Sequence, residues 1–399
     1  MAFGGDPHRP PHANDIREFF AMAQRTMLIT NDFPPRTGGT ETFGYELARR
    51  MPAAGAGDVL VYTSASAGQR EFDRVQPFAI VRDPARTLLP TPRVARKSAD
   101  LVREHGCDRV VIGSAAPLGL LARGLRTAGV REIVALTHGH EAWWSQLPGV
   151  RRVLRRIGDD VDVLTYLGEY TRDLLQDALG STARHRLVKL APGVDTDLFH
   201  PERDGSAVRE RYGLGQGPVI LSVCRLVPRK GVDALIRAMS WVRVRHPRAR
   251  LLVVGEGPDE RRLRDLAAWM GVDAEVVFAG AHPNTELPEF YAAADLFAMP
   301  CRSRRAVLEA EGLGIVFLEA AASGLAVLAG NSGGAPEAVR HGETGYVVDG
   351  RDPGEVARRV TRVLDAPEHA RAMGLRGREW VLEDWTWEHA TRRLAGLRG

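Results

Sequence analysis

The stretch EAEGLGIVFLEA, residues 309–320, carries two glutamates, Glu311 and Glu319, that stand eight positions apart. Between them lies Gly312-Leu313-Gly314, followed by an apolar run that is typical of a helix start. A glycine weakens a helix interior by about 1 kcal/mol, so the two glycines predict a turn in front of the helix. Such a turn lets the backbone approach another group closely, and the first amides of the following helix are free to hold phosphate.

The two carboxylates of this stretch are expected to lie at different depths. Glu311 precedes the predicted helix, whereas Glu319 lies more than one turn into it. One can therefore reach the hydroxyls of a sugar and the other the ribose of a nucleotide. Paired carboxylates that accept hydrogen bonds from vicinal diols indicate a sugar-nucleotide site.

Short apolar runs alternate with longer amphipathic ones on both sides of this stretch. Strands are predicted at 26–30, 58–63, 78–82, 109–114 and 132–139, and in a second series at 218–225, 249–257, 275–280, 294–300, 325–330 and 344–349. Helices are predicted between them at 41–51, 94–106, 232–246 and 314–324. This alternation predicts an α/β protein with parallel sheets covered on both faces. Two series predict two Rossmann-like, doubly wound domains that face a cleft.

The length of 399 residues also favours two domains, because one core of that size is unusual. We expect residues 1–25 to form a mobile tail. The first domain should span 26–200 and the second 201–378, joined near 190–205. Residues 379–399 are predicted to be a helix whose three tryptophans pack rather than catalyse.

Composition narrows the possible partners. The net charge of +4, from 54 basic and 50 acidic residues, permits an anionic substrate or membrane surface without demanding nucleic acid. Cys107, Cys224 and Cys301 form no CxxC pair, which favours a reducing cytosol over a zinc site or disulfides. The sequence has no apolar run of about twenty residues and no signal peptide, so we expect neither a membrane span nor secretion. The oligomeric state is left open.

NDFPPRTGG (31–39) directly follows the first predicted strand, where sheets of this kind bind ligands. Gly38 and Gly39 precede a helix, whose unpaired N–H groups and dipole favour an anion. The alternative interpretation is an ordinary loop between a strand and a helix.

RLVPRKG (225–231) follows the first strand of the second series. Arg225 and Lys230 stand five positions apart across a proline turn and can converge on one polyanion. We expect them to bind a diphosphate, because a cation placed where leaving-group charge develops can be worth about 10²–10³ in rate. A solvated basic loop is the alternative.

THGHE (137–141) follows another predicted strand. His138, His140 and Glu141 could suggest a metal site, but histidines two positions apart do not share one helix face, and no third histidine stands nearby. We expect His138 to face the substrate at the mouth of the cleft. The alternative is a histidine that only hydrogen-bonds within its loop.

Taken in order, several motifs resemble the retaining glycosyltransferases of family 4, which have the GT-B fold. They are NDFPPRTGG, THGHE, APGVDTDLFHP, RLVPRKG, the E-x7-E pair and GNSGGAPEAV. The resemblance runs from about residue 26 to the end of the sequence. It is strongest to the actinobacterial phosphatidylinositol mannosyltransferases that add the second mannose from GDP-mannose. One departure lies at 301–312, where Arg302, Arg304 and Arg305 replace a glycine-rich segment. This loop is expected near the sugar site, so the departure leaves the sugar and acceptor preference open.

The resemblance implies roles for the residues already named. Catalytic roles fall to His138 at the transferred sugar, Arg225 and Lys230 at the diphosphate, and Glu311 at the sugar hydroxyls. Arg225, Lys230 and Glu311 would also bind the donor. The other donor-binding groups would be Gly38, Gly39, Glu319 at the ribose, and the amides of Ile315, Val316 and Phe317. The first domain would hold the acceptor and the second the donor, and the final helix would cross back to the first domain.

The resemblance also implies the reaction. A hexose, mannose from GDP-mannose, would be transferred with retention to a mannosylated phosphatidylinositol at the cytoplasmic membrane face. No cofactor or metal would be required, because cations replace the metal. No residue is placed as a covalent nucleophile, so the leaving phosphate would help to deprotonate the acceptor on the same face. Three alternatives stay open: another nucleotide sugar with a soluble or natural-product acceptor, a sugar-nucleotide epimerase, and a non-catalytic binding module.

Some patterns suggest other chemistry. DTD (195–197) and DVD (160–162) match the metal-binding DxD of other glycosyltransferases, and VVGEGPDERRL (253–263) is a dinucleotide fingerprint that lacks its third glycine. GNSGG (330–334) fits the G-x-S-x-G of hydrolases, with Asp349 and His369 following in hydrolase order. A hydrolase leaves the glutamate pair and the basic loop without a role.

RRVLRRIGDDVDVL (151–164) is basic and then acidic. Its arginines fall on neighbouring positions of a helix, which is typical of a solvated face. The functional alternative is attraction to anionic lipid, at about 1 kcal/mol for each basic residue near the surface.

Overall fold

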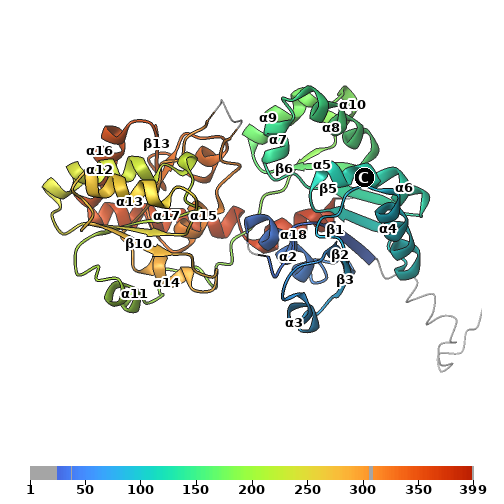
Figure 1. Ribbon diagram of the computed structural model, residues 1–399, viewed down its shortest axis with the longest axis horizontal. Helices are drawn as coiled ribbons and strands as arrows, with labels where there is room; N and C mark the ends of the chain where they lie inside the picture. Colours follow the sequence, from blue (N-terminus) through green and yellow to red (C-terminus); the bar gives the residue numbers. More distant parts are fainter. Residues whose placement is uncertain (1–24, 37, 305–308, 398–399) are drawn as a thin grey trace, which may run out of the picture.

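The computed structural model describes residues 25–36, 38–304 and 309–397. Two α/β domains lie side by side along the longest axis of the molecule (Figure 1). The predicted tail falls almost wholly outside the described residues, and Arg25 already belongs to the first strand. The two-domain α/β architecture predicted from the sequence is confirmed.

The first domain contains a seven-stranded parallel sheet. In sheet order the strands are β3 (Ala79–Asp83), β2 (Asp58–Ser64), β1 (Arg25–Thr30), β4 (Arg109–Ile112), β5 (Glu132–Ala135), β6 (Val163–Tyr166) and β7 (Leu187–Lys189). The order reverses between β1 and β4, and such a reversal is where sheets of this type form a ligand crevice at the strands' carboxyl ends. Strands β6 and β7 were not predicted.

Helices cover both faces of this sheet. They are α2 (Gly39–Arg50), α3 (Gln69–Arg74), α4 (Pro92–His105), α5 (Ala115–Leu118), η1 (Gly119–Leu121), α6 (Ala122–Thr127), α7 (His140–Trp144), α8 (Pro148–Asp160), α9 (Glu169–Ala178) and α10 (Ser181–Arg184). Helix α4 shows how the sequence fixes their ends. The Thr91 side chain accepts a hydrogen bond from the Val94 amide, Pro92 occupies the first turn, and Gly106 ends the helix at φ 63°.

The second domain contains a six-stranded parallel sheet with a similar reversal, between β8 and β11. In sheet order its strands are β10 (Val276–Gly280), β9 (Arg250–Val254), β8 (Val219–Val223), β11 (Leu296–Met299), β12 (Val327–Gly330) and β13 (Gly345–Val348). The central strands β8, β11 and β12 are buried along their whole length, as expected for a sheet that is covered on both faces. All six strands lie within the ranges predicted from the apolar runs.

The helical elements of the second half of the chain pack mostly on this sheet. They are α11 (Ser206–Arg211), η2 (Pro228–Lys230), α12 (Val232–Arg245), α13 (Glu260–Trp269), α14 (Leu287–Ala292), α15 (Ile315–Ala322), η4 (Ala335–Ala338), α16 (Pro353–Leu364), α17 (Pro367–Asp384) and α18 (Trp387–Gly396).

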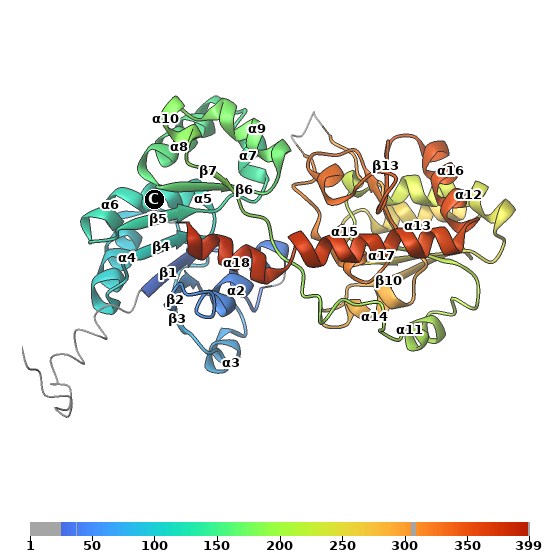
Figure 2. The same cartoon turned by 180° about the vertical axis from the view of Figure 1, so that it is seen from behind.

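The single helix predicted at 379–399 is wrong in one respect. Helix α17 ends at Asp384, and α18 begins after Thr386, whose side chain accepts a hydrogen bond from the His389 amide (3.3 Å). The break lets α17 lie on the second domain while α18 continues onto the first (Figure 2). There Trp387 and Leu394 join the core of the first domain beside α2. The nearby tryptophans at 380 and 385 are buried as well, as predicted for packing residues.

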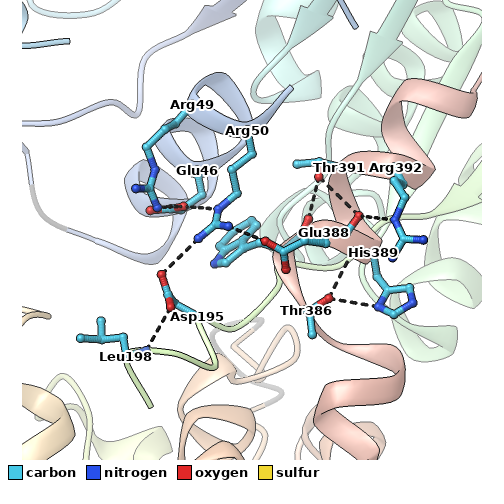
Figure 3. Close-up of polar contacts among 11 residues, drawn as sticks. Glu46, Arg49, Arg50, Asp195, Leu198, Thr386, Glu388, His389, Thr391 and Arg392 are labelled. Carbon is cyan, nitrogen blue, oxygen red and sulfur yellow. Dashed lines mark hydrogen bonds and ion pairs between the residues drawn. The ribbon is translucent and has the colours of Figure 1, made fainter. Parts of the chain in front are cut away.

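The chain crosses between the domains twice, and the two crossings lie together. The Val194 amide donates a hydrogen bond to the Trp385 carbonyl (2.7 Å). Beside them, the Arg50 guanidinium from α2 contacts the carboxylates of Glu46 (2.8 Å), Asp195 (3.1 Å) and Glu388 (2.5 Å), as Figure 3 shows. One arginine therefore connects the first domain, the linker and the returning helix.

Candidate active site

Loops at the carboxyl ends of the two sheets meet. Gly139 follows β5 of the first domain, and Gly312 precedes α15 of the second. A Cβ added to Gly139 would lie 2.9 Å from the Gly312 Cα atom, and one added to Gly312 would lie 3.3 Å from the His138 carbonyl oxygen. The close approach predicted for the glycine turn is therefore made to the other domain, and it places the His138 loop against the Glu311 loop.

Lys230 and Glu311 form a buried ion pair at this junction. The Lys230 Nζ atom lies 2.7 Å from Glu311 Oε2, and Arg229 Nη1 lies 2.6 Å from the same oxygen. Burial alone would raise the pKa of the Glu311 carboxyl, but the two cations outweigh it and lower that pKa. Glu311 is therefore a carboxylate at neutral pH, held by two positive groups. Arg229 belongs to the basic loop RLVPRKG, but nothing in the sequence assigned it a role in the site.

The GNSGG segment supports Glu311. The Ser332 hydroxyl is buried, accepts a hydrogen bond from the Glu311 amide (3.2 Å) and lies 3.1 Å from the Ser303 hydroxyl. The Gly334 amide donates to the Glu311 carbonyl (2.9 Å). Ser332 thus holds the backbone of the glutamate loop, whereas a hydrolase would present it as an exposed nucleophile.

Glu319 lies deeper than Glu311, as predicted, inside α15. Its Oε2 atom accepts a hydrogen bond from the Tyr291 hydroxyl (2.9 Å). Burial raises the pKa of Glu319 to about 7, although the Tyr291 hydrogen bond acts in the opposite direction. Tyr291 carried no signal in the sequence that tied it to this glutamate, because it comes from α14.

The turn in front of α15 depends on Gly314. Its φ of 85° is strained for other residues, and a Cβ there would lie 2.6 Å from the Phe317 ring. Ile315 and Val316 begin the helix, at the end where backbone amides lack helical partners. The Phe317 amide donates to the Gly314 carbonyl (3.1 Å), so it is already engaged, unlike the free amide that the sequence predicted.

His138 is positioned by its own domain. Its Nε2 atom contacts the Gly113 carbonyl, and its backbone amide donates to Glu141 Oε2 (2.9 Å). Glu141 is buried and also accepts from the Ser114 hydroxyl (3.0 Å). The Phe43 ring packs against the His138 ring edge to face, with centroids 5.7 Å apart. Glu141 therefore fixes the loop that carries His138.

Gly38 and Gly39 lie exposed at the start of α2. A Cβ on Gly38 would lie 2.2 Å from Glu41 Oε2, so the Glu41 carboxylate folds over this turn. Burial raises the pKa of Glu41, and His138 is close enough to act on it electrostatically. Glu41 was missed by sequence reasoning, although an acidic residue in a first helical turn after two glycines is a usable signal.

Arg225 was predicted to converge with Lys230, but it does not take part in the Lys230–Glu311 ion pair. It is exposed just after β8, and within the described ranges its guanidinium has no ion-pair partner. By contrast, Arg302 is taken up elsewhere: it pairs with Asp233 in α12 (2.8 Å), and its amide donates to the Arg229 carbonyl (2.8 Å). Arg304 pairs with Glu309 (3.4 Å), and Arg305 lies outside the described residues.

The alternative motifs have structural roles. Asp195 of DTD pairs with Arg50 and accepts from the Leu198 amide (3.1 Å), and Asp162 of DVD accepts from the Ile133 amide (2.7 Å). In the part of the chain that the structure describes, no three His, Cys, Asp or Glu side chains are grouped to hold a metal ion. Metal independence stays a prediction. No helix among the described residues is long and apolar enough to cross a membrane.

Two doubly wound domains whose strand-end loops meet around a buried Lys–Glu pair form the GT-B architecture. The structure is similar to Anabaena HepE, with a TM-score of 0.77 and 18% identity, covering 93% of this chain and 98% of that one. It is also similar to sucrose-phosphate synthase from Thermosynechococcus elongatus, with a TM-score of 0.75 and 22% identity, covering 94% and 98%.

Sequence comparison gives the family. Residues 37–198 match the model described as Glycosyltransferase Family 4, and residues 207–380 match Glycosyl transferases group 1. The chain is 47% identical to the GDP-mannose-dependent alpha-(1-6)-phosphatidylinositol monomannoside mannosyltransferase of Mycobacterium tuberculosis, covering 94% of this chain and 98% of that one. It is 48% identical to the protein of the same name from Mycolicibacterium smegmatis, covering 93% and 97%. The chain therefore belongs to glycosyltransferase family 4.

Proposed function

We propose that this glycosyltransferase transfers mannose from GDP-mannose to a phosphatidylinositol mannoside, with retention of the anomeric configuration. The observation that carries the proposal is the identity of 47% and 48%, over nearly the whole chain, to relatives whose names state that donor and that acceptor. A relative from Corynebacterium glutamicum, 42% identical, has a name that specifies a monoacylated form of the acceptor. The site geometry below is consistent with such a donor.

The Lys230–Glu311 ion pair can open when the donor binds, because each side chain then finds a new partner on the donor. Before the donor binds, Glu311 neutralises Lys230 (2.7 Å). A diphosphate provides Lys230 with stronger anionic partners, and Arg225, exposed nearby, can turn toward the same group. Arg229 then keeps Glu311 ionised (2.6 Å), while the carboxylate accepts hydrogen bonds from the sugar hydroxyls. The amides of Ile315 and Val316 and the turn at Gly38 and Gly39 complete the phosphate and sugar contacts.

The positions of Glu319 and His138 in the site indicate their roles. Glu319, deeper in α15, accepts a hydrogen bond from a ribose hydroxyl in place of Tyr291. His138 lies on the opposite side of the Gly139–Gly312 contact and faces the transferred sugar. Lys230 and Arg225 stabilise the departing diphosphate, so that no metal is needed. The acceptor hydroxyl attacks on the face from which the diphosphate leaves, and its proton passes to the leaving phosphate.

A lipid acceptor requires access to a membrane surface. Helix α8 exposes four arginines, which we call the basic face: Arg151, Arg152, Arg155 and Arg156. Just before this helix, Trp144 and Leu147 are each 44% exposed. Basic residues attract anionic headgroups, and exposed apolar side chains insert at the interface. We propose that this part of the first domain docks peripherally on the inner face of the cell membrane.

A soluble acceptor is the second candidate. The chain is 31% identical to a D-inositol 3-phosphate glycosyltransferase of Acidothermus cellulolyticus, covering 90% of this chain and 85% of that one. An inositol phosphate and the headgroup of a phosphatidylinositol share the same ring and phosphate. The two candidates therefore differ mainly in whether a membrane is required.

One experiment separates these cases. The protein is incubated with GDP-mannose, UDP-glucose or ADP-glucose, together with phosphatidylinositol monomannoside in vesicles or with free inositol phosphate, and the products are identified by mass spectrometry. The proposal expects a dimannosylated lipid from GDP-mannose only. Product from inositol phosphate alone supports the soluble acceptor, and an isomerised sugar nucleotide without acceptor indicates an epimerase. A thermal shift with GDP that exceeds those with UDP and ADP would support the donor assignment independently.

A further inference from the structure

Helix α9 of the first domain is capped by a carboxylate from the second domain. Both oxygens of Glu337, in η4, accept hydrogen bonds: one from the Glu169 amide (2.7 Å) and one from the Tyr170 amide (2.9 Å). These are the first two amides of α9, which have no partner within the helix. A negative charge at this end is also favoured by the helix dipole.

The first domain leaves this position open for Glu337. The residue before α9 is Gly168, which has no side chain to cap the helix. A Cβ added there would lie 2.4 Å from Glu337 Oε2. The backbone of Gly168 is extended (φ −159°), so other residues could adopt it without strain. The glycine is therefore explained by the approach of Glu337 rather than by backbone conformation.

The domains are not packed closely behind this contact. A pocket of about 830 Å³ that is open to solvent extends from Glu337 to the crossing at Trp385, and residues of both domains line it, including Lys189 and Trp380. Closer to the site, the domains meet through the backbones of Gly139 and Gly312. The cap on α9 is thus a specific polar contact at a sparsely packed part of the interface.

Glu337 is also linked to the donor glutamate. It lies three residues after Gly334, whose amide holds the Glu311 carbonyl (2.9 Å). On the other side, the Leu167 side chain just before α9 lies near both glycines of the junction, 3.8 Å from a Cβ on Gly139 and 3.3 Å from one on Gly312. One short segment of the second domain therefore holds Glu311 at one end and the His138 side of the first domain at the other.

We propose that Glu337 is a positioning residue for the transfer step. It caps α9 across the domain interface and so holds His138 in register with the Glu311 loop. It touches no reacting atom, and donor binding to the second domain does not require it. This inference rests on the proposed function only in its activity assay.

Two variants remove the cap from opposite sides. Glu337→Ala removes the carboxylate, and Gly168→Ala places a methyl group where the carboxylate lies, with the backbone unchanged. Glu337→Gln keeps one accepting oxygen and should be intermediate. Glu343→Gln is the matched control, because Glu343 is an exposed carboxylate of the same domain. We expect kcat to fall about 10- to 100-fold in the first two variants, in the range that small misplacement of reacting groups costs.

Three further measurements separate positioning from general damage. GDP affinity by calorimetry should stay at the value of the unmodified protein. The melting temperature should fall only by the few degrees that the loss of one helix cap costs. Spin labels on Glu104→Cys in α4 and Arg358→Cys in α16 report the distance between the two domains. The distribution of this distance should broaden in both variants. The three native cysteines are buried and will not compete for the label. The proposal is overturned if the distribution of distances does not broaden, or if kcat is unchanged in both variants. It is also overturned if the loss of kcat is accompanied by lost GDP affinity and by a fall in melting temperature larger than one cap explains. If the unmodified protein does not transfer mannose, the proposed function fails, whereas the distance measurement still tests the cap.

Discussion

Replacing Glu319 by glutamine should stabilise the second domain at pH 8 and change its stability little at pH 5. Burial in α15 raises the pKa of this carboxyl from 4.5 to about 7, despite the opposing hydrogen bond from Tyr291. The folded chain therefore keeps a proton that the unfolded chain releases as the pH rises above 4.5. Glutamine has the shape of the protonated acid but does not titrate, so it removes this pH dependence.

The size of the effect follows from the two pKa values. Each tenfold difference in proton affinity is worth about 1.4 kcal/mol, so a pKa of about 7 in place of 4.5 corresponds to about 3 kcal/mol. This contribution favours the folded state fully below pH 4.5 and is lost as the pH rises through 7. For a domain of this size, about 3 kcal/mol corresponds to a melting-temperature change of roughly 6–12 °C.

The assay is thermal unfolding, followed by circular dichroism from pH 4 to 8.5, of the unmodified protein, Glu319→Gln and the exposed-site control Glu343→Gln. The melting temperature of the unmodified protein and of the control should fall between pH 5 and 8 relative to that of Glu319→Gln. Parallel curves for all three proteins would refute the reasoning, since Glu319 would then titrate alike in the folded and unfolded states. GDP affinity should also fall in Glu319→Gln, because an amide is a weaker acceptor for a ribose hydroxyl.

Four other outcomes are expected. Lys230→Ala or Glu311→Ala should lower turnover about a hundredfold, near 3 kcal/mol, and normal rates in a folded variant would contradict the assignment. Reversing the charges of the basic face should abolish sedimentation with anionic vesicles while leaving the circular dichroism spectrum intact; retained binding would remove that face from the membrane proposal. Arg50→Ala should cost only about 1 kcal/mol in denaturant unfolding, because its partners are partly exposed and screened, and a loss of several kcal/mol would show a larger role. Turnover should survive EDTA, whereas loss restored by Mg²⁺ or Mn²⁺ would disprove metal independence.

The sequence predicted the fold well because its signal was local. Buried parallel strands appear as short apolar runs, and each strand of the second domain lies within such a run. Strand β6 was missed because VLTY follows an arginine-rich helix and an acidic turn, which hid it. The break after Asp384 was also missed, since Trp385 and Thr386 lie within an otherwise helical stretch and only the threonine cap marks the new start.

The site was predictable in its types of residue but not in its pairings. Spacing placed Lys230 and Glu311 after strands, yet nothing in the sequence showed that they bind each other or that Arg229 shares the carboxylate. The Tyr291–Glu319 hydrogen bond joins two helices, and the Glu337 cap joins residues 168 positions apart. Such pairings depend on how the sheets and domains assemble, which periodicity does not encode.

The paired crossings at Val194 and Trp385 have a consequence for engineering. Since the described chain begins at Arg25 in the first domain and finishes there with α18, the second domain is an insertion with two adjacent junctions. A donor module from a related enzyme could therefore be exchanged as a cassette cut at these neighbouring points. Truncation before α18, in contrast, would remove Trp387 and Leu394 from the core of the first domain and expose the apolar face of α2 to solvent.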